Sequence, residues 1–370
     1  MLKELIHTPE GVRDIYGDEE RNKLSVVSLI KKTINLYGYE DIETPTFEYF
    51  DVFSKEIGTT PSRELYKFFD RDGDTLVLRP DFTPSVARCV AKYYGEETSP
   101  IKLTYCGNTF VNNSGLKGKL KESTQIGVEL MNDASAMADA ESINLVIESL
   151  KSAGLSDFQI SLGHMEYFKG LCDNAGIEEE NELLLRAYVS HKNFNPATEL
   201  LDSLNCDEKS KELLLLSGES IGDYSVIATA LDKINNERSK KALLRLTEVY
   251  EILKVFGNEK YVSFDLGMLS KYNYYTGVIF KAYTYGSGDA VAKGGRYDTL
   301  VSSFGSSKPA VGFVILIDDL LMALERNHVL TERHQGPVLL SYDAGNYKEK
   351  IKQAEKMRKE GTAVSLVPSK

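Results

Sequence analysis

The sequence concentrates tyrosines and glycines in one region that could form a small-molecule site. Residues 271–286 read KYNYYTGVIFKAYTYG, and GGRY follows at 294–297. Aromatic walls with few polar groups are the usual construction of such a site. The tyrosines predicted to line a slot are Tyr274, Tyr275 and Tyr297, and the glycines expected to close it are Gly294 and Gly295. The alternative is that the tyrosines are half-buried packing residues with surface hydroxyls, and this alternative is strongest for Tyr274.

A second candidate group lies in QIGVE at residues 125–129. Gln125 and Glu129 are four residues apart, and positions i and i+4 of a strand share a face, so both side chains are predicted to point into one pocket. Two other interpretations stay open. The pair could be a solvated strand face, and Asp81 could simply cap the helix that begins at Thr83.

The sequence shows no pattern typical of a catalytic or metal site. No Ser-His-Asp spacing is visible, and His164 is expected to be a satisfied residue at a strand end. No catalytic residue is predicted. The cysteines at positions 89, 106, 172 and 206 lack CxxC spacing, which favours core thiols in a reducing compartment over bound zinc.

Composition narrows the class of partner. The chain has 370 residues, a net charge of −11 and a pI of about 5.2, so no general positive field attracts nucleic acid. The N-terminus has no apolar core typical of a signal peptide, and no uncharged apolar run is long enough to span a bilayer. We expect a cytoplasmic protein that contacts neither nucleic acid nor membrane.

Hydrophobic periodicity predicts an α+β fold. Helices are expected at 19–37, 83–94, 138–154, 318–327 and 347–359, and the first has Leu24, Val27, Ile30, Ile34 and Tyr37 at the spacing of one apolar face. Strands are expected at 39–50, 100–111, 119–131, 158–165, 261–268, 275–286, 309–317, 336–343 and 363–367, with a hairpin at 64–81 whose turn contains Gly73. Hairpins as well as helical connections favour a mostly antiparallel sheet.

Changes in composition predict four segments. Residues 166–255 are rich in Leu, Glu, Lys and Asn with helical periods, which indicates a helical insertion. The core is expected in two parts, 1–165 and 256–330, and residues 335–370 are expected to form a small C-terminal βαβ piece.

Several segments occur in the order found in histidyl-tRNA synthetases. They include HTPEGVRDIYGDE, LYKFFDRDGDTLVLRPDFTPSVAR, QIGVEL and YYTG followed by GGRYD, and the resemblance covers residues 8–325. A match of this many ordered segments is far more specific than one motif. The resemblance implies a class II aminoacyl-tRNA synthetase-like fold, an antiparallel sheet flanked by helices, and a homodimer formed through the synthetase-like core.

The sequence departs from these enzymes at the positions that bind ATP. Val111 and Asn113 stand where the family has the arginine and glutamate of FRxE. Ser270 replaces the arginine of RGLDYY, and Asp319 replaces the arginine that holds the phosphates. Transition-state charge on a phosphate needs cationic partners, so adenylation is predicted to be lost. Lys271, next to Ser270, is the only candidate for a compensating cation.

The amino-acid pocket of these enzymes is better preserved. By resemblance, the α-ammonium and imidazole of histidine would be held by Asp81, Thr83, Gln125, Glu129, Tyr274, Tyr275 and Tyr297. A carboxylate paired with a phenol supplies the acceptor and donor that an imidazole needs. No cofactor is expected, and histidine is the predicted allosteric ligand.

A pocket that binds histidine without activating it is similar to the family of ATP phosphoribosyltransferase regulatory subunits. Members lack the full anticodon-binding domain of about 90–100 residues, for which the stretch after position 325 is too short. The resemblance implies a non-catalytic chain in a hetero-octamer with the short catalytic subunit, which it activates and through which histidine inhibits. The alternatives are an active histidyl-tRNA synthetase with degenerate motifs and an enzyme that transfers amino acids to another acceptor.

Overall fold

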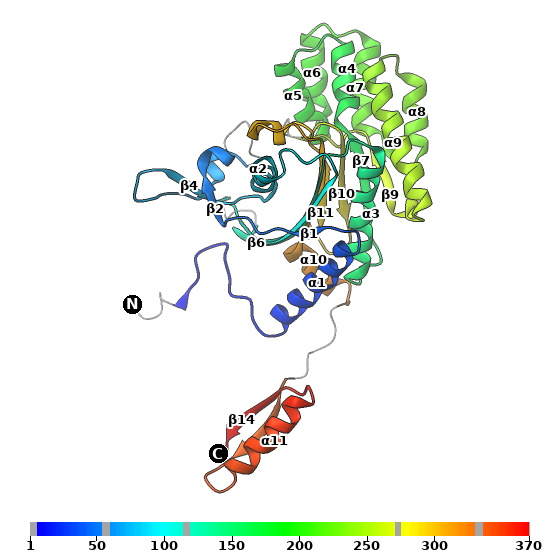
Figure 1. The fold of residues 1–370 in the computed structure, drawn as a ribbon. Helices are drawn as coiled ribbons and strands as arrows, with labels where there is room; N and C mark the ends of the chain where they lie inside the picture. Colours follow the sequence, from blue (N-terminus) through cyan, green and yellow to red (C-terminus); the bar gives the residue numbers. More distant parts are fainter. Residues whose placement is uncertain (1–5, 54–59, 114–118, 271–274, 330–335, 370) are drawn as a thin grey trace. The chain divides into compact units, whose positions relative to one another are not determined.

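The computed structural model describes residues 6–53, 60–113, 119–270, 275–329 and 336–369 (Figure 1). The chain forms two compact units. The first comprises residues 1–15 and 22–330, and the second comprises residues 16–21 and 331–370. The candidate site lies in the first unit.

A mixed, mostly antiparallel sheet is the centre of the first unit. Its strand order is β1-β5-β6-β12-β11-β10-β7-β9-β8, and only the β1–β5 and β7–β9 pairs are parallel. The strands are β1 (Glu40–Asp41), β5 (Ile101–Phe110), β6 (Glu122–Met131), β7 (Gln159–His164), β8 (Ile221–Gly222), β9 (Val262–Asp265), β10 (Val278–Tyr283), β11 (Ala292–Arg296) and β12 (Ala310–Leu316). Central β6 pairs with β5 on one side and β12 on the other.

The alternation of side chains on β6 separates the two faces of the sheet. Ile126, Val128 and Leu130 belong to a core shared with α1 (Asp18–Asn35), α3 (Ala136–Ser152) and α10 (Ile317–Arg326) (Figure 1). The alternate residues Gln125 and Glu129 face the other way and line a cavity. Period-two alternation therefore makes one face a helix-covered core and leaves the other for a site.

Helix α1 packs through a slightly different stripe from the predicted one. Val26, Ile30 and Ile34 are buried at i, i+4 and i+8, whereas Leu24 is 59% exposed. The helical period thus puts Val26, not Leu24, on the core face. Gly38, which directly follows the range predicted for this helix, has a left-handed φ of 80°.

A small sheet precedes the helix whose start lines the cavity. The strands β2 (Phe47–Tyr49), β3 (Lys67–Phe69) and β4 (Thr75–Leu78) pair in the order β2-β4-β3. The predicted hairpin joins β3 to β4, and Gly73 has the positive φ of 92° that its turn requires. Helix α2 (Thr83–Tyr93) begins at Thr83 with Pro84 in its first turn, as the sequence predicts.

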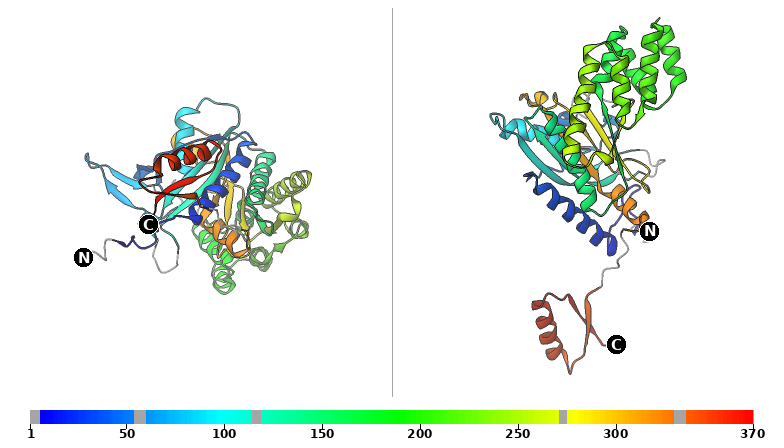
Figure 2. Two further views of the ribbon diagram at one scale, coloured as in Figure 1. Left: turned by 90° about the horizontal axis from the view of Figure 1, so that it is seen from below. Right: turned by 90° about the vertical axis from the view of Figure 1, so that its right-hand side faces the viewer.

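Residues 165–255 fold almost entirely as helices. They are α4 (Met165–Asn174), α5 (Glu179–Ser190), α6 (Phe194–Ser203), α7 (Glu208–Glu219), α8 (Ser225–Lys233) and α9 (Glu237–Val255). Both views in Figure 2 show them as one cluster beside the sheet. The second unit contains β13 (Val338–Tyr342), α11 (Tyr347–Lys359) and β14 (Val364–Pro368), and its two strands are parallel.

The α+β class and the mostly antiparallel sheet are confirmed, but two further details differ from the prediction. Residues 292–296 form β11, which the sequence analysis did not predict. Cys172 is buried, but Cys106 is exposed, so the cysteines are not all core thiols; all four are free. Within the described ranges, no helix combines the length and apolar character needed to cross a bilayer.

Candidate functional site

A cavity of about 270 Å³ opens on the face of the sheet opposite α1, α3 and α10. The predicted binding residues that line it are Asp81, Thr83, Gln125, Glu129, Tyr275 and Tyr297. Tyr274 lies outside the described residues. These residues come from the start of α2, from β6, and from the ends of β10 and β11, so the fold brings together groups that are far apart in the sequence.

Glu129 is the central polar group of the cavity. Its side chain is 1% exposed, and its carboxylate accepts hydrogen bonds from Thr83 Oγ1 at 2.7 Å, Tyr105 Oη at 3.3 Å and the hydroxyl of Tyr297. Burial raises the pKa of Glu129 to about 8, although the hydrogen bonds from Tyr297 and Thr83 oppose this shift. A carboxyl with such a pKa can exchange a proton with an imidazole at neutral pH.

Asp81 and Thr83 are organised by the beginning of α2. Asp81 Oδ1 accepts hydrogen bonds from the backbone N–H groups of Phe82 at 2.7 Å and Thr83 at 3.4 Å, although the N-cap residue of the helix is Phe82 and not Asp81. The carboxylate also lines the cavity. Thr83 instead orients Glu129 through its hydroxyl. Asp81 thus provides negative charge, and Thr83 fixes the carboxyl beside it.

The Gln125 side chain is largely buried and lines the cavity. Its side chain is 9% exposed, and no hydrogen bond to another described residue is recorded for its amide. A buried amide normally has a partner, because losing hydrogen bonds to water without replacement costs about 1–3 kcal/mol. The amide is therefore available to a ligand or to water in the cavity.

Glycines determine how closely side chains approach the sheet. A Cβ on Gly312 would lie 1.9 Å from Glu129 Oε2, and one on Gly295 would lie 2.8 Å from the Tyr275 ring. Gly295 therefore makes room for Tyr275, not directly for a ligand. Gly294 lines the cavity, and a Cβ on it would meet the Phe280 ring at 2.5 Å and the Gly312 carbonyl, so this glycine also permits close packing within the sheet.

Tyr105, Lys293 and Gly312 are among the site residues that the sequence analysis missed. Tyr105 lies directly opposite Gly127, stacks on Phe82 with centroids 4.4 Å apart, and donates to Glu129. A Cβ on Gly127 would lie 2.5 Å from the Tyr105 hydroxyl, so this glycine lets the phenol reach the site. The available signal was the glycine two residues before Glu129, on the same face of the strand.

The positions predicted to have lost ATP-binding cations differ in their surroundings. Val111 and Ser270 line the cavity and bring no charge. Asp319 does not line it and lies in the first turn of α10, where burial and the charges of Asp289 and Asp318 raise its pKa. Among the described lining residues, Lys293 is the only lysine or arginine. Lys271 lies outside the described residues.

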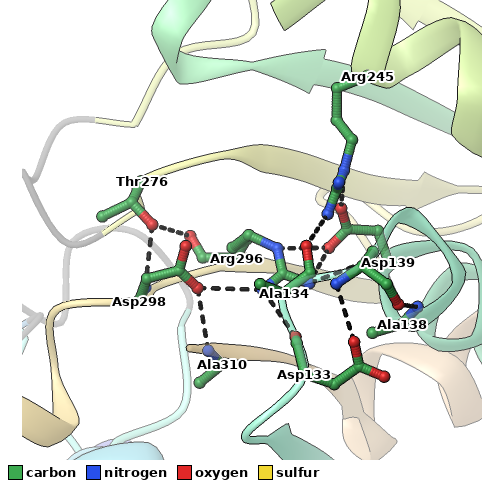
Figure 3. A network of polar contacts seen from close by, with 10 residues as sticks. Asp133, Ala134, Ala138, Asp139, Arg245, Thr276, Arg296, Asp298 and Ala310 are labelled. Carbon is green, nitrogen blue, oxygen red and sulfur yellow. Dashed lines mark hydrogen bonds and ion pairs between the residues drawn. The ribbon is translucent and has the colours of Figure 1, made fainter. Parts of the chain in front are cut away.

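Figure 3 shows a polar network that includes Arg296 and Asp298, the residues on either side of Tyr297. Asp139 at the start of α3 is fully buried and binds Arg296 of β11 at 2.7 Å and Arg245 of α9 at 2.8 Å. Arg296 also binds Asp298, whose carboxylate accepts from the Ala310 backbone N–H at 3.0 Å. Because Tyr297 lies between Arg296 and Asp298, the network fixes the backbone that carries the phenol bound to Glu129.

The helical segment also reaches the loop beside the cavity. Arg186 of α5 is paired with Glu182 and donates from Nη1 to the Ser270 carbonyl at 3.3 Å. The described residues contain no group of three or more side chains suited to a metal ion. The site therefore consists of carboxyl, phenol, hydroxyl, amide and amine groups arranged around a small cavity.

Comparison with known proteins places the chain in a family. A family model described as Histidyl-tRNA synthetase matches residues 11–320. An ATP phosphoribosyltransferase regulatory subunit from Acetivibrio thermocellus is 41% identical over 98% of this chain and 86% of its own length. One from Clostridium kluyveri is 36% identical over 97% of this chain and 93% of its own length.

Solved structures agree with these sequence matches. A Bacillus halodurans protein described as an ATP phosphoribosyltransferase regulatory subunit/histidyl-tRNA synthetase has a TM-score of 0.90 at 35% identity, covering 98% of this chain and 93% of that one. A histidyl-tRNA synthetase from Nostoc has a TM-score of 0.82 at 19% identity, covering 99% and 86%, which shows the shared class II fold. The chain therefore belongs to the family of ATP phosphoribosyltransferase regulatory subunits, built on the fold of histidyl-tRNA synthetases.

Proposed function

We propose that this chain binds histidine in the 270 Å³ cavity, activates the short catalytic ATP phosphoribosyltransferase, and transmits feedback inhibition by histidine at the first step of histidine biosynthesis. The observation that carries the proposal is the buried Glu129 carboxyl, held by Thr83, Tyr105 and Tyr297 in a small cavity. The names of the relatives supply the catalytic partner.

The chemistry of the cavity suits an imidazole. An imidazole carries one N–H donor and one nitrogen acceptor when neutral, and two donors when protonated. Glu129 accepts from a donor when ionised and donates when protonated, and its pKa of about 8 makes both states accessible near neutral pH. Asp81 and the Gln125 amide then bind the α-ammonium, which needs acceptors.

The surroundings of the cavity argue against adenylation. A triphosphate needs several cations in fixed positions. Val111 and Ser270 offer none, and Lys293 alone among the described lining residues is cationic. This supports a chain without aminoacylation activity of its own, in which histidine acts as a signal and not as a substrate.

Feedback inhibition requires that histidine binding is linked thermodynamically to the arrangement of the complex. Histidine must bind the inhibited arrangement of the complex more tightly than the active one, because a ligand with equal affinity for both shifts nothing. A coupling free energy of about 1–3 kcal/mol would change activity by several-fold to about a hundredfold. The contacts of Arg186 with Ser270 and of Arg245 with Asp139 connect the helical segment to the site and offer routes for this coupling.

The proposed assembly is a hetero-octamer that contains homodimers of this chain in the cytoplasm. Exposed aromatic side chains on the small sheet support a protein contact there: Phe47 is 52% exposed, Tyr49 59% and Phe69 73%. Sedimentation of the chain alone and with the catalytic subunit would measure both associations.

A reconstitution assay tests the function. The short catalytic subunit is assayed alone, with this chain, and with this chain plus histidine. We expect this chain to raise the rate and histidine to lower it again, while calorimetry detects histidine binding to this chain alone. Absence of activation would refute the regulatory role. Absence of a heat of histidine binding would refute the assignment of the cavity as the histidine site.

The alternative is a histidyl-tRNA synthetase-like enzyme with degenerate motifs. The description of the matching family model favours it. Histidine-dependent exchange between ATP and pyrophosphate by the purified chain separates the two functions. We expect no exchange above a sample without enzyme, and exchange that depends on Glu129 would establish the alternative.

A further inference from the structure

Two lysines lie directly opposite each other on the cavity side of the sheet. Lys281 of β10 pairs with Lys293 of β11, and the same row continues through Val314 of β12 to Gly127 of β6. Like charges opposite each other destabilise a sheet. No ion pair or hydrogen bond to another described residue is recorded for either amine, so their mutual repulsion is not offset by direct contact with a described carboxylate.

The pair lies where two cavities meet. Lys293 lines the 270 Å³ cavity and also a neighbouring one of about 360 Å³, which Lys281 lines as well. Asp265 borders the second cavity, but its carboxylate lies 3.5 Å from Lys192 Nζ and accepts from the Gly267 backbone N–H at 3.0 Å. The excess charge at the junction is therefore positive, in a chain whose net charge is −11.

Other carboxylates act on the two lysines only from a distance. The charge of Lys281 contributes to lowering the pKa of Asp289, and the charge of Lys293 opposes the burial that raises the pKa of Asp319. Asp289 is already paired with Lys119 at 3.0 Å. An anion at the junction of the two cavities would be attracted by both amines and would not displace an existing ion pair.

The strand register determines how far Lys293 lies from Glu129. Glu129 lies in a row with Gly312 and Gly295, and Lys293 lies two residues further along the same face of β11. Two residues of a strand span about 7 Å, and β11 lies two strands, about 10 Å, from β6, so the backbone positions of Glu129 and Lys293 are about 12 Å apart. The side chains of both residues extend into this gap, so a ligand with its imidazole on Glu129 and its backbone end toward Gln125 can direct its carboxylate to Lys293.

The geometry points to Lys293, with Lys281 opposite it, as the binding site for the α-carboxylate of the amino acid in the cavity. This inference rests on the proposed function and adds the group that distinguishes a free amino acid from its derivatives. A free amino acid has two opposite charges, and each needs a partner when water is removed. Asp81 offers the negative partner, and Lys293 is the only described lining cation that offers the positive one.

Calorimetry with two ligands tests the inference. Histidine and histidinol share the imidazole and the ammonium, but histidinol has an alcohol in place of the carboxylate. We expect wild type to bind histidine at least about tenfold more tightly than histidinol, as the loss of a charge-assisted hydrogen bond implies. Lys293→Met should lower the affinity for histidine about tenfold or more, leave that for histidinol nearly unchanged, and so bring the ratio toward one.

Matched variants control for fold and general charge. Lys281→Met should lower the affinity for histidine by a smaller factor, because Lys281 does not line the first cavity. Lys241→Met removes an exposed charge from α9 and should leave both affinities unchanged. Thermal unfolding of each variant verifies that the chain is folded before titration.

The outcomes separate this inference from the proposed function. If wild type binds neither ligand, the proposed histidine site itself is wrong, and this inference falls with it. If wild type binds both but Lys293→Met keeps the preference for histidine, only the carboxylate site is wrong. Titration with inorganic phosphate adds a third arm: phosphate binding that requires both lysines, with unchanged affinity of Lys293→Met for histidine, would show a separate anion site and overturn the inference.

Discussion

Arg296 Nη2 lies 2.7 Å from Oδ1 of the fully buried Asp139, and this ion pair holds the strand from which the next residue reaches Glu129. The second oxygen of Asp139 binds Arg245 at 2.8 Å. One carboxylate thus joins α3, the helical segment and the strand that supports the ligand cavity. Such a network specifies one arrangement, because breaking it leaves a buried charge without full compensation.

Removal of Arg296 should destabilise the protein strongly. We expect Arg296→Met to lower the free energy of unfolding by about 3–5 kcal/mol, as for other broken buried ion pairs. Arg245→Met should lower the free energy of unfolding by less, because the Arg245 side chain is 24% exposed and Asp139 keeps its ion pair with Arg296. Urea unfolding followed by circular dichroism measures both, and equal losses would contradict the greater importance of Arg296.

Stability should depend on pH through Glu129. Its pKa is about 8 in the folded protein and near 4.5 when exposed, so the folded state binds the proton more tightly. The stabilisation is fully present below pH 4.5 and is lost as the pH rises to about 8. Relative to Glu129→Gln, which has no such proton, wild type should lose a few kcal/mol between pH 5 and pH 9.

The measurement for this prediction is urea unfolding of both proteins across that pH range. The relevant quantity is the difference in the free energy of unfolding between wild type and Glu129→Gln, because the other groups titrate equally in both proteins. A difference that stays constant with pH would mean that Glu129 is ionised in the folded protein throughout.

Changes to cavity groups should desensitise the complex to histidine without dissociating it. Glu129→Ala and Tyr275→Ala each remove a group that lines the cavity, so the histidine concentration for half-inhibition should rise at least about tenfold. Tyr285→Phe alters a tyrosine that is 75% exposed, so it should leave the histidine concentration for half-inhibition unchanged. Inhibition curves and sedimentation of the reconstituted complex provide the two measurements, and wild-type sensitivity in both alanine variants would show that histidine binds elsewhere.

A methyl group at Gly312 should displace the central carboxyl. The added Cβ would lie 1.9 Å from Glu129 Oε2 and 2.5 Å from the Val128 carbonyl, so Glu129 and the strand must move. We expect Gly312→Ala to lose most histidine affinity and about 1–3 kcal/mol of stability. Gly288→Ala, where no atom lies within 4 Å of the added Cβ, is the matched control. Unchanged calorimetric binding by Gly312→Ala would exclude Glu129 from the ligand contact.

Sequence patterns that act within a few residues predicted much of the fold. Gly38 and Gly154 adopt the left-handed φ expected after helices, and Gly73 the positive φ of the hairpin turn. The four-residue spacing of Gln125 and Glu129 correctly placed both side chains on one face of β6. These features depend on backbone conformation within a few residues, which the sequence encodes directly.

Other features depend on partners that are distant in the sequence. The stretch 292–296 contains two glycines and has little strand propensity, yet it forms β11 because β10 and β12 pair with both of its edges. Asp139 and Arg296 are 157 residues apart, and Glu129 and Tyr297 are 168 apart. No local pattern predicts such pairs, so the predicted phenols could be assembled only by resemblance, and Tyr105 was missed.

The bare backbone at Gly295 and Gly312 has a genetic consequence. A glycine codon becomes an alanine codon through a single base change, and a Cβ at either position would collide with Tyr275 or with Glu129. Resistance to a toxic mimic of histidine should therefore arise readily by mutation at these two codons. Sequencing of spontaneous resistant isolates would then locate the sensor without any purified protein.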